Sequence, residues 1–234
     1  MPVNDPELVR DQYEREDNLR ARQALYEEKE GPDAREAVWE ALAELAPRRV
    51  LEVGGGPGEL AERMQRELGA EVRFVDTSPR MVELARTRGV EAQVGDVQAL
   101  PFGDESFDAV VAAWMLYHVP DLDRALAEIE RVVAPGGALV AVTNSADHLR
   151  ELRELISYRG GFESTFSREN GEEHLRRHFA RVEQRDIDAT VIVRDRAKLV
   201  AYRDSLSLGA GEVPKDMELP FVMHARSSVF VARK

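Results

Sequence analysis

The glycine-rich segment Gly54-Gly55-Gly56-Pro57-Gly58 constrains the fold of this chain more than any other feature. It follows a short apolar run over residues 49–53 and precedes a stretch of helical periodicity over residues 59–68. A buried strand that passes through a glycine loop into a helix brings backbone close to a ligand and offers it the N–H groups of the helix start. The segment therefore predicts a strand–loop–helix unit that binds a nucleotide-like cofactor.

Strands and helices continue to alternate after this unit. Apolar runs as continuous as these are typical of strands that are covered on both faces, and the alternation predicts an α/β fold with a parallel sheet. We expect strands at 72–75, 90–94, 107–113 and 138–143, with helices at 79–88 and 121–134. Beyond Asn144 we expect a helix to about 158, a short helix capped by Asn170, a strand at 182–193, a helix at 195–208 and a last strand at 221–232.

The length of 234 residues fits one domain with appendages. Residues 1–47 are predicted to form an N-terminal helical arm or cap, because charged residues dominate the segment 5–30 and apolar residues are sparse there. Residues 48–234 are predicted to form the α/β domain, with lid elements within residues 145–219.

Composition and charge exclude several classes of function. The net charge of -12 opposes binding to a nucleic-acid polymer or an anionic membrane, and the chain has no apolar run near the roughly 18 residues of a membrane span. Without cysteine, disulfides, thiolate zinc sites and cysteine nucleophiles are excluded. The spacing of His174 and His178 could bind a metal, but no third ligand is evident, so no metal is predicted. No secretory signal is visible, and we expect a cytoplasmic protein of undefined oligomeric state.

Acidic residues follow the second and third predicted strands: Asp76 follows the strand at 72–75, and Asp96 follows the strand at 90–94. Asp76 ends the strand at 72–75, where a carboxylate can accept hydrogen bonds from both hydroxyls of a ribose. The pattern Gly56-x-Gly58-x-x-Ala61 also satisfies the relaxed dinucleotide fingerprint, with Asp76 about twenty residues beyond it. These residues alone therefore leave an NAD(P)-dependent oxidoreductase open.

A longer series of motifs distinguishes these possibilities. It comprises Leu51-Glu-Val-Gly-Gly-Gly-Pro-Gly58, Gly95-Asp96-Val97, Leu116-Tyr117-His118-Val119 and Pro135-Gly136-Gly137, in this order between residues 49 and 143. The series resembles the class I S-adenosylmethionine-dependent methyltransferases of type 11, which include enzymes of quinone and natural-product pathways. The resemblance implies a Rossmann-like, doubly wound sheet of seven mostly parallel strands whose last strand, at 227–232, is antiparallel.

The same resemblance implies S-adenosylmethionine as cofactor and S-adenosylhomocysteine as product. The sequence has a counterpart for each cofactor-binding feature of the family. These features are the acidic residue of the first motif, the glycine loop, the acid that binds the ribose, the turn that contacts adenine and the residues that flank the methionine portion. The implied cofactor-binding residues are Glu52, Gly54, Gly56, Gly58, Asp76, Thr77, Met81, Asp96, Val97, Ala113 and Trp114.

The acceptor side is predicted from fewer signals. Tyr117 and His118 are the candidates for catalysis, and His118 could deprotonate an acceptor. Tyr13 and Tyr26 on the arm, together with Asn144, are the candidates for contact with the substrate. The expected reaction is in-line displacement that moves a methyl group to an O, N or C nucleophile of a small molecule.

Two alternatives stay open. An NAD(P)-dependent oxidoreductase predicts a Tyr-x-x-x-Lys or comparable pair, but Tyr117 is followed four places on by Asp121, and Tyr158 by Phe162. A binding module that holds S-adenosylmethionine without turnover is compatible with every motif above.

Overall fold

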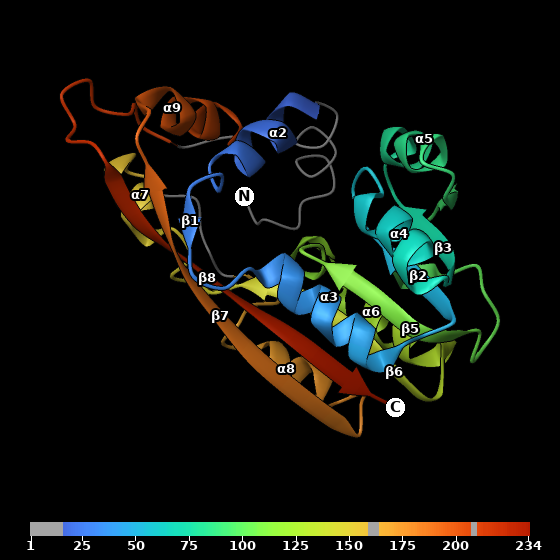
Figure 1. Ribbon diagram of the computed structural model, residues 1–234. Helices are drawn as coiled ribbons and strands as arrows, with labels where there is room; N and C mark the ends of the chain where they lie inside the picture. Colours follow the sequence, from blue (N-terminus) through green and yellow to red (C-terminus); the bar gives the residue numbers. More distant parts are fainter. Residues whose placement is uncertain (1–15, 159–163, 207–209) are drawn as a thin grey trace.

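The strands of the computed structural model form one sheet, which Figure 1 shows with its flanking helices; the structure describes residues 16–158, 164–206 and 210–234. The sheet has eight strands within these residues, in the order β1-β7-β8-β6-β5-β2-β3-β4. Their bounds are β1 Lys29–Glu30, β2 Arg49–Val53, β3 Glu71–Asp76, β4 Glu91–Val94, β5 Phe107–Ala113, β6 Val133–Asn144, β7 Arg181–Val193 and β8 Phe221–Arg233.

The strand directions confirm the predicted architecture. The pairs β2–β3, β3–β4, β2–β5 and β5–β6 are parallel, whereas β8 is antiparallel to both of its neighbours, β6 and β7. The chain moves outward from β2 through β3 to β4, and then returns to the other side of β2 with β5. This reversal places a switch point between the carboxyl ends of β2 and β5, where open α/β sheets bind their ligands.

The sheet has one strand more than the seven predicted. The additional strand is β1, which pairs antiparallel with the edge of β7 through Lys29 and Glu30, in a segment expected to be helical. Two charged residues carry no alternating pattern, so their strand conformation comes from the edge on which they lie and not from their own sequence.

Strand β6 begins five residues before its predicted start. Helix α6 (Leu122–Val132) ends directly before the strand, and pairing with β5 begins at Val133, with a register shift between the positions opposite Phe107 and Ala109. Gly136 takes a φ of 78° within this irregular stretch. The Pro135-Gly136-Gly137 segment, read from the sequence as the end of a helix, is therefore a bulged entry into the strand.

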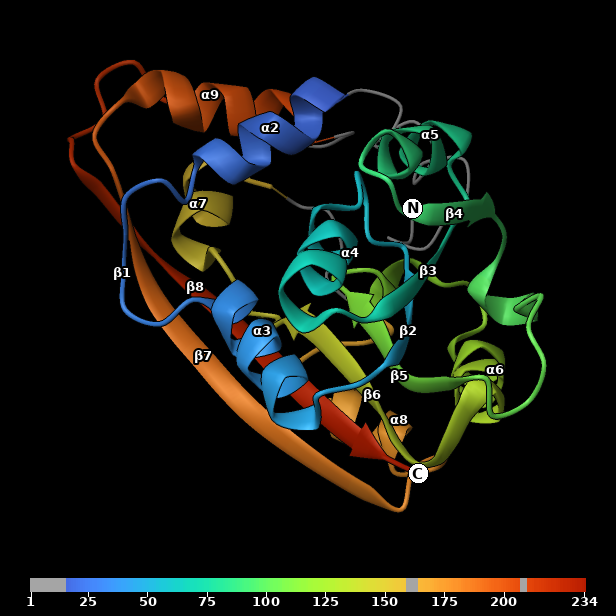
Figure 2. The same ribbon diagram turned by 45° about the vertical axis from the view of Figure 1, so that its right-hand side comes forward.

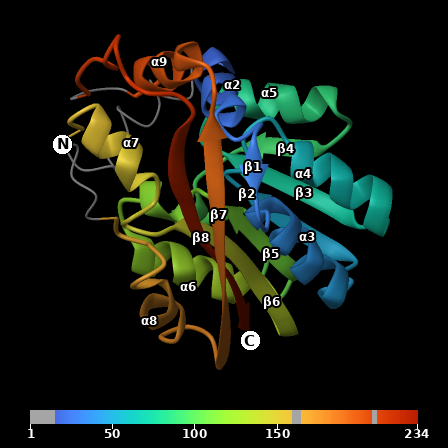
Figure 3. The ribbon, with the colours of Figure 1, turned by 60° about the vertical axis from the view of Figure 1, so that its left-hand side comes forward.

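Helices cover both faces of the sheet, as Figure 3 shows. Apolar residues of α3, α4 and α5 pack on one face, and those of α6 and α8 pack on the other. Asp33, Ser78, Asp121 and Asp195 cap the helices that follow them by accepting a backbone N–H. The bounds are α3 Ala34–Leu45, α4 Glu59–Arg63 with a π turn at Met64–Leu68, α5 Pro79–Thr87, α6 Leu122–Val132 and α8 Gly171–Leu175.

A third group of helices lies beyond the carboxyl ends of the parallel strands. It consists of α2 (Glu16–Ala24), α7 (Arg150–Leu155) and α9 (Arg196–Asp204), and Figure 2 shows α2 beside α9. A separate apolar cluster, which includes Leu25, Leu152 and Leu199, joins them to the far halves of β7 and β8. We call residues 16–28, 150–158 and 194–206, which contain these three helices, the cap.

Candidate cofactor and acceptor site

A large cavity lined by described residues lies between the cap and the carboxyl ends of β2, β3, β5 and β6. Its volume is about 1810 Å³. A single small ligand occupies roughly 300–1,000 Å³ in most proteins, so this cavity has room for two molecules side by side. Its lining combines the glycine loop and strand ends on one side with cap residues on the other.

The glycine loop bends sharply where β2 ends. Gly54, Gly56 and Gly58 have φ values of 63°, 60° and 80°, in the left-handed region that favours glycine. A Cβ atom at Gly55 would lie 2.3 Å from Cδ of Glu52, whereas one at Gly56 would meet nothing within 4 Å. The loop is therefore packed tightly against β2 on its inner side and open toward the cavity at Gly56.

Glu52 is a buried carboxyl directly beneath this loop. Only 1% of the residue is exposed, and its Oε2 atom has no hydrogen-bond partner among the described residues. Burial raises the pKa of Glu52 to about 8, the charge of Asp76 adds to the rise, and a hydrogen bond with the Ala61 backbone opposes it. The carboxyl is therefore protonated at neutral pH, and a cation bound beside it would favour its ionised form.

Asp76 lies at the end of β3, on the neighbouring side of the cavity. Its Oδ1 atom accepts the Ser78 N–H at 2.8 Å. Burial raises the pKa of Asp76 to about 6, against the lowering effect of hydrogen bonds from the Ser78 and Gly56 backbones. Thr77 is exposed on the cavity wall, and Met81, in the first turn of α5, lies buried behind it.

Asp96 and Val97 lie at the rim of the cavity after β4. The Asp96 side chain caps a short 3-10 turn, Val97–Ala99, by accepting the Gln98 N–H at 2.8 Å. Both Asp96 oxygens also accept the Gln98 side-chain amide, at 3.0 and 2.9 Å. Asp96 therefore caps this turn, and its Oδ2 atom, which accepts only the Gln98 side-chain amide within the described part of the chain, has room to accept a second donor.

Trp114 and Asn144 connect the ends of β5 and β6. Trp114 has a φ of 53°, and its indole N–H donates to Oδ1 of Asn144 at 3.1 Å. The Ser227 hydroxyl on β8 donates to the same oxygen at 2.9 Å. Two donors thus fix the Asn144 amide, and Ala113, Trp114 and Asn144 all line the cavity.

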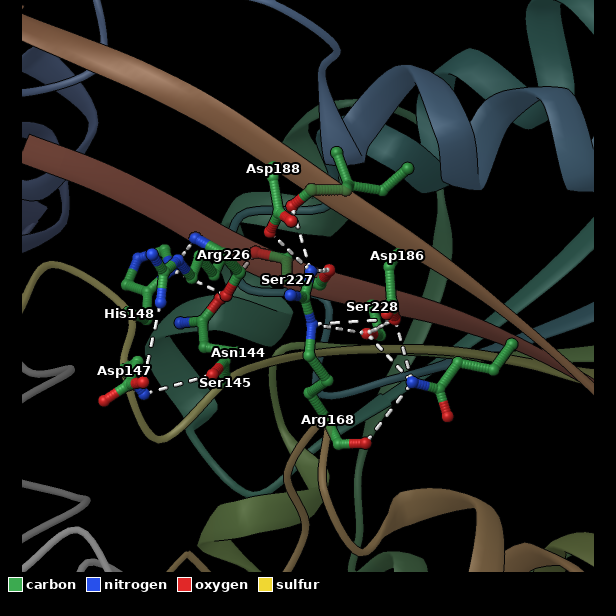
Figure 4. A network of polar contacts seen from close by, with 12 residues as sticks. Asn144, Ser145, Asp147, His148, Arg168, Asp186, Asp188, Arg226, Ser227 and Ser228 are labelled. Atoms are coloured by element: carbon green, nitrogen blue, oxygen red, sulfur yellow. Dashed lines mark hydrogen bonds and ion pairs between the residues drawn. The ribbon is translucent and has the colours of Figure 1, made fainter.

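A polar network behind the sheet holds Ser227 in place, as Figure 4 shows. Arg168, which precedes α8, donates from Nε to the Ser228 hydroxyl at 2.9 Å and from Nη2 to the Ser227 carbonyl at 2.5 Å. Its guanidinium also pairs with Asp188 of β7 at 2.8 Å. This support could not be predicted from the sequence, because it joins residues far apart in the chain.

The predicted acceptor-side residues divide into those that the structure brings to the cavity and those that it does not describe. Tyr117 and His118 line the cavity on the 3-10 turn Leu116–His118, with ring centroids 4.4 Å apart. Tyr26 lines it from the cap, between α2 and β1. Tyr13 lies outside the described residues.

His148 was not predicted, although it lies in the same cavity. Its Nε2 atom is 2.8 Å from the Tyr26 hydroxyl, and its position is four residues beyond the end of β6. The motif series ends at residue 143, so no familiar pattern covers this histidine. The one available signal was its place just after a parallel strand, where side chains meet at the ligand-binding edge.

The histidine pair considered for metal binding lies away from the cavity. His178 contacts Asp123 at 3.0 Å and Glu130 at 3.5 Å on α6. Within the described part of the chain, no group of three His, Cys, Asp or Glu residues is arranged to hold a metal ion. None of the described helices is both long and apolar enough to cross a membrane.

The fold and cavity together define a class: an α/β protein whose glycine loop and strand-end acids meet at a switch point, the place where open α/β sheets bind their ligands. Comparison with known proteins makes the class more specific. Residues 51–141 match the family model described as a methyltransferase domain. This segment is a class I methyltransferase domain of type 11, as the motif series indicated.

Individual relatives match a part of the chain of similar length. The chain is 44% identical over 115 residues to the demethylmenaquinone methyltransferase of Thermus thermophilus, covering 46% of this chain and 52% of that protein. It is 41% identical over 112 residues to the ubiquinone biosynthesis O-methyltransferase of Xanthomonas oryzae, covering 44% and 46%. The matched region thus spans about half the length of these curated relatives.

A solved structure extends the similarity of the fold over the whole chain. A phosphoethanolamine N-methyltransferase of Haemonchus contortus, in complex with S-adenosylhomocysteine, aligns with a TM-score of 0.63 and 20% identity. The alignment covers 100% of this chain and 60% of that one. At 20% identity, this similarity concerns the overall fold alone.

Proposed function

We propose that this protein transfers a methyl group from S-adenosylmethionine to an O, N or C nucleophile of a small molecule and releases S-adenosylhomocysteine. The observation that carries this proposal is the meeting of the glycine loop, Glu52 and Asp76 at one end of a cavity large enough for a second molecule. The methyltransferase domain match over residues 51–141 supports the same reaction.

The residues of the cavity fit this cofactor. The cofactor carries an ammonium and a sulfonium cation, and Glu52 supplies a buried carboxyl with an oxygen that has no described partner. Asp76 supplies a second carboxyl that can accept hydrogen bonds from ribose hydroxyls. The open side of the loop at Gly56 allows close approach of a ligand, because nothing would lie within 4 Å of a side chain there.

The bound cofactor would supply an activated methyl group, so the protein has mainly to position the reactants and exclude water. Trp114 would lie beside the methionine end of the cofactor, and Asn144, fixed by Trp114 and Ser227, would contact the acceptor. Tyr117 and His118 would contact the acceptor, with His118 available to take a proton from it.

The cap would close the site. We propose that the arm within residues 1–47 and lid elements within residues 145–219 enclose the acceptor, as the packing of α2, α7 and α9 around one apolar cluster supports. The net charge of -12 supports a small-molecule acceptor over a nucleic-acid polymer. A cytoplasmic location stays a prediction from the sequence.

Release of S-adenosylhomocysteine in the presence of a panel of phenolic, amine and carbon-acid acceptors tests the proposal. Turnover with at least one acceptor is expected, and Asp76→Ala should abolish it. Asp104→Ala is the matched control, because Asp104 is 76% exposed and pairs with Arg131 outside the cavity. Cofactor binding without turnover of any acceptor would instead indicate a binding module, and binding of NAD would indicate an oxidoreductase.

A further inference from the structure

A chain of three hydrogen-bonding groups runs from β8 through His148 to the cavity. The Arg226 backbone N–H donates to Nδ1 of His148 at 3.0 Å, and Nε2 of the same ring is 2.8 Å from the Tyr26 hydroxyl. Tyr26 belongs to the cap, whereas His148 follows β6. The chain therefore connects the arm to the edge of the sheet at the acceptor side of the cavity.

The backbone of β8 selects the tautomer of His148. The Arg226 carbonyl, 2.9 Å from Nδ1, already accepts the Ser145 N–H at 2.9 Å, whereas the Arg226 N–H uses Nδ1 as its acceptor. With a proton on Nδ1, the Nδ1–H and the Arg226 N–H would point toward each other. The enclosed Arg226 N–H would then have no acceptor, which is energetically costly. The neutral ring therefore carries its proton on Nε2.

The surroundings of the ring keep it neutral. Burial lowers the pKa of His148 to about 4; a hydrogen bond with the Arg226 backbone opposes this change, and the positive charges of Arg153 on α7 and Arg168 before α8 add to it. Asp147, which precedes His148, pairs with Arg226 at 3.5 Å. At neutral pH the imidazole is thus a fixed donor toward Tyr26.

This assignment determines what Tyr26 can offer a ligand. Its oxygen accepts the Nε2–H of His148, so its own O–H is left to donate elsewhere. Burial raises the pKa of Tyr26 well above its ordinary value, which keeps that proton in place. The cavity lining includes the apolar and aromatic residues Leu152, Ile156, Tyr117 and Tyr202, and the positive charges of Arg22 and Arg35 also act on Tyr26.

We propose that Tyr26 and His148 form an acceptor-recognition pair, in which the Tyr26 O–H, oriented by His148, donates to an oxygen atom of the methyl acceptor. The proposal rests on the proposed methyltransferase function and narrows its substrate class. The acceptor is a largely apolar molecule with a carbonyl, carboxylate or hydroxyl oxygen at this point. A protonated amine at the same point has no lone pair for Tyr26 and is rejected. His148 acts through Tyr26 and is a positioning residue.

The nitrogen signals of His148 in the histidine-labelled full chain test the pair without any acceptor. Two-bond proton–nitrogen correlation spectra should show the Nε2–H tautomer between about pH 6 and pH 8, and His148→Gln identifies the signal. Tyr26→Phe should move the Nε2 resonance and leave the tautomer unchanged. A ring protonated on Nδ1, or on both nitrogens at neutral pH, would overturn the proposal whether or not the protein methylates anything.

Steady-state kinetics with the acceptors found in the turnover panel test the role in recognition. Tyr26→Phe should raise KM for oxygen-bearing acceptors about tenfold with little change in kcat, and leave the affinity for S-adenosylhomocysteine unchanged. His148→Leu should have the same effect, and adding it to Tyr26→Phe should change nothing more. His148→Gln, which keeps a donor, should restore part of the affinity. His224→Gln is the matched control, on an exposed histidine outside the cavity lining.

The kinetic results can also contradict the proposal. Additive effects of the two substitutions would show that His148 does not act through Tyr26. Equal KM values for wild type and Tyr26→Phe would show that Tyr26 does not bind the acceptor. Failure of every acceptor in the panel would count against the proposed function, and the nitrogen spectra would still decide the state of the pair.

Discussion

Replacing Glu52 with glutamine tests the electrostatics of the site through the stability of the protein. Burial raises the pKa of the Glu52 carboxyl from 4.5 to about 8 in the folded chain. Between these two values the folded state keeps a proton that the unfolded state releases. The contribution of Glu52 to the free energy of unfolding is therefore complete below the lower value and is lost as the pH rises through the upper one.

The size of the effect follows from this shift. Each pH unit inside the window removes about 1.4 kcal/mol, up to a total of about 5 kcal/mol above it. Glutamine has nearly the same shape but does not titrate. The free energy of unfolding of Glu52→Gln, minus that of wild type, should thus grow by about 3 kcal/mol between about pH 5 and pH 8.

Urea unfolding followed by circular dichroism, at several pH values and without cofactor, measures this difference. Glu40→Gln is the control, because Glu40 is exposed on α3 and its variant should follow wild type at every pH. The free energy of unfolding of Glu52→Gln, minus that of wild type, could instead stay constant to within about 0.5 kcal/mol from about pH 5 to pH 8. That result would refute a buried, protonated carboxyl beneath the glycine loop.

Three further predictions concern the cofactor end of the cavity. Asp76→Asn should weaken binding of S-adenosylmethionine by about 10- to 100-fold in calorimetry, since one amide group cannot accept two hydroxyl protons, while Asp104→Asn binds as wild type does. Gly55→Ala should lower the free energy of unfolding by about 1–3 kcal/mol, because its Cβ would lie 2.3 Å from Cδ of Glu52. Gly103→Ala, whose Cβ would lie 3.6 Å from its nearest neighbour, should have little effect. Binding of S-adenosylmethionine near pH 7 should release up to about one proton, visible as a buffer-dependent heat that Glu52→Gln removes; a heat independent of buffer would contradict the link to Glu52.

Much of the sheet could be predicted because the buried parallel strands differ clearly from their surroundings. The strand expected at 107–113 is β5 with the same bounds, and Ser78 and Asp121 cap the helices expected after them. A strand covered on both faces is a continuous apolar run, and a capping residue marks a helix start locally. Both signals lie within a few residues of sequence.

Other features depend on contacts between distant segments and left little or no local signal. The strand β1 forms from Lys29 and Glu30 because the edge of β7 is available beside them. His148 becomes a site residue only because the arm brings Tyr26 to it, 122 positions away in the chain. Ser227 supports Asn144 across the antiparallel pairing of β8 with β6. Such residues are found from the structure, because their role is defined by their partners.

The acids and glycines at the cofactor end of the cavity could be predicted only in part. Their positions could be predicted from motif order, but their state could not. The sequence placed Glu52 beside the loop, whereas its burial and protonation follow from packing. Asp96 was expected to contact adenine, and in the structure it caps the turn that begins at Val97.

Calorimetric titration of the full chain with S-adenosylmethionine, S-adenosylhomocysteine and NAD is the most direct test of the cofactor assignment. We predict that both sulfur compounds bind at one site per chain and compete with each other, and that NAD gives no heat of binding. Binding of NAD, with no heat from either sulfur compound, would contradict the account.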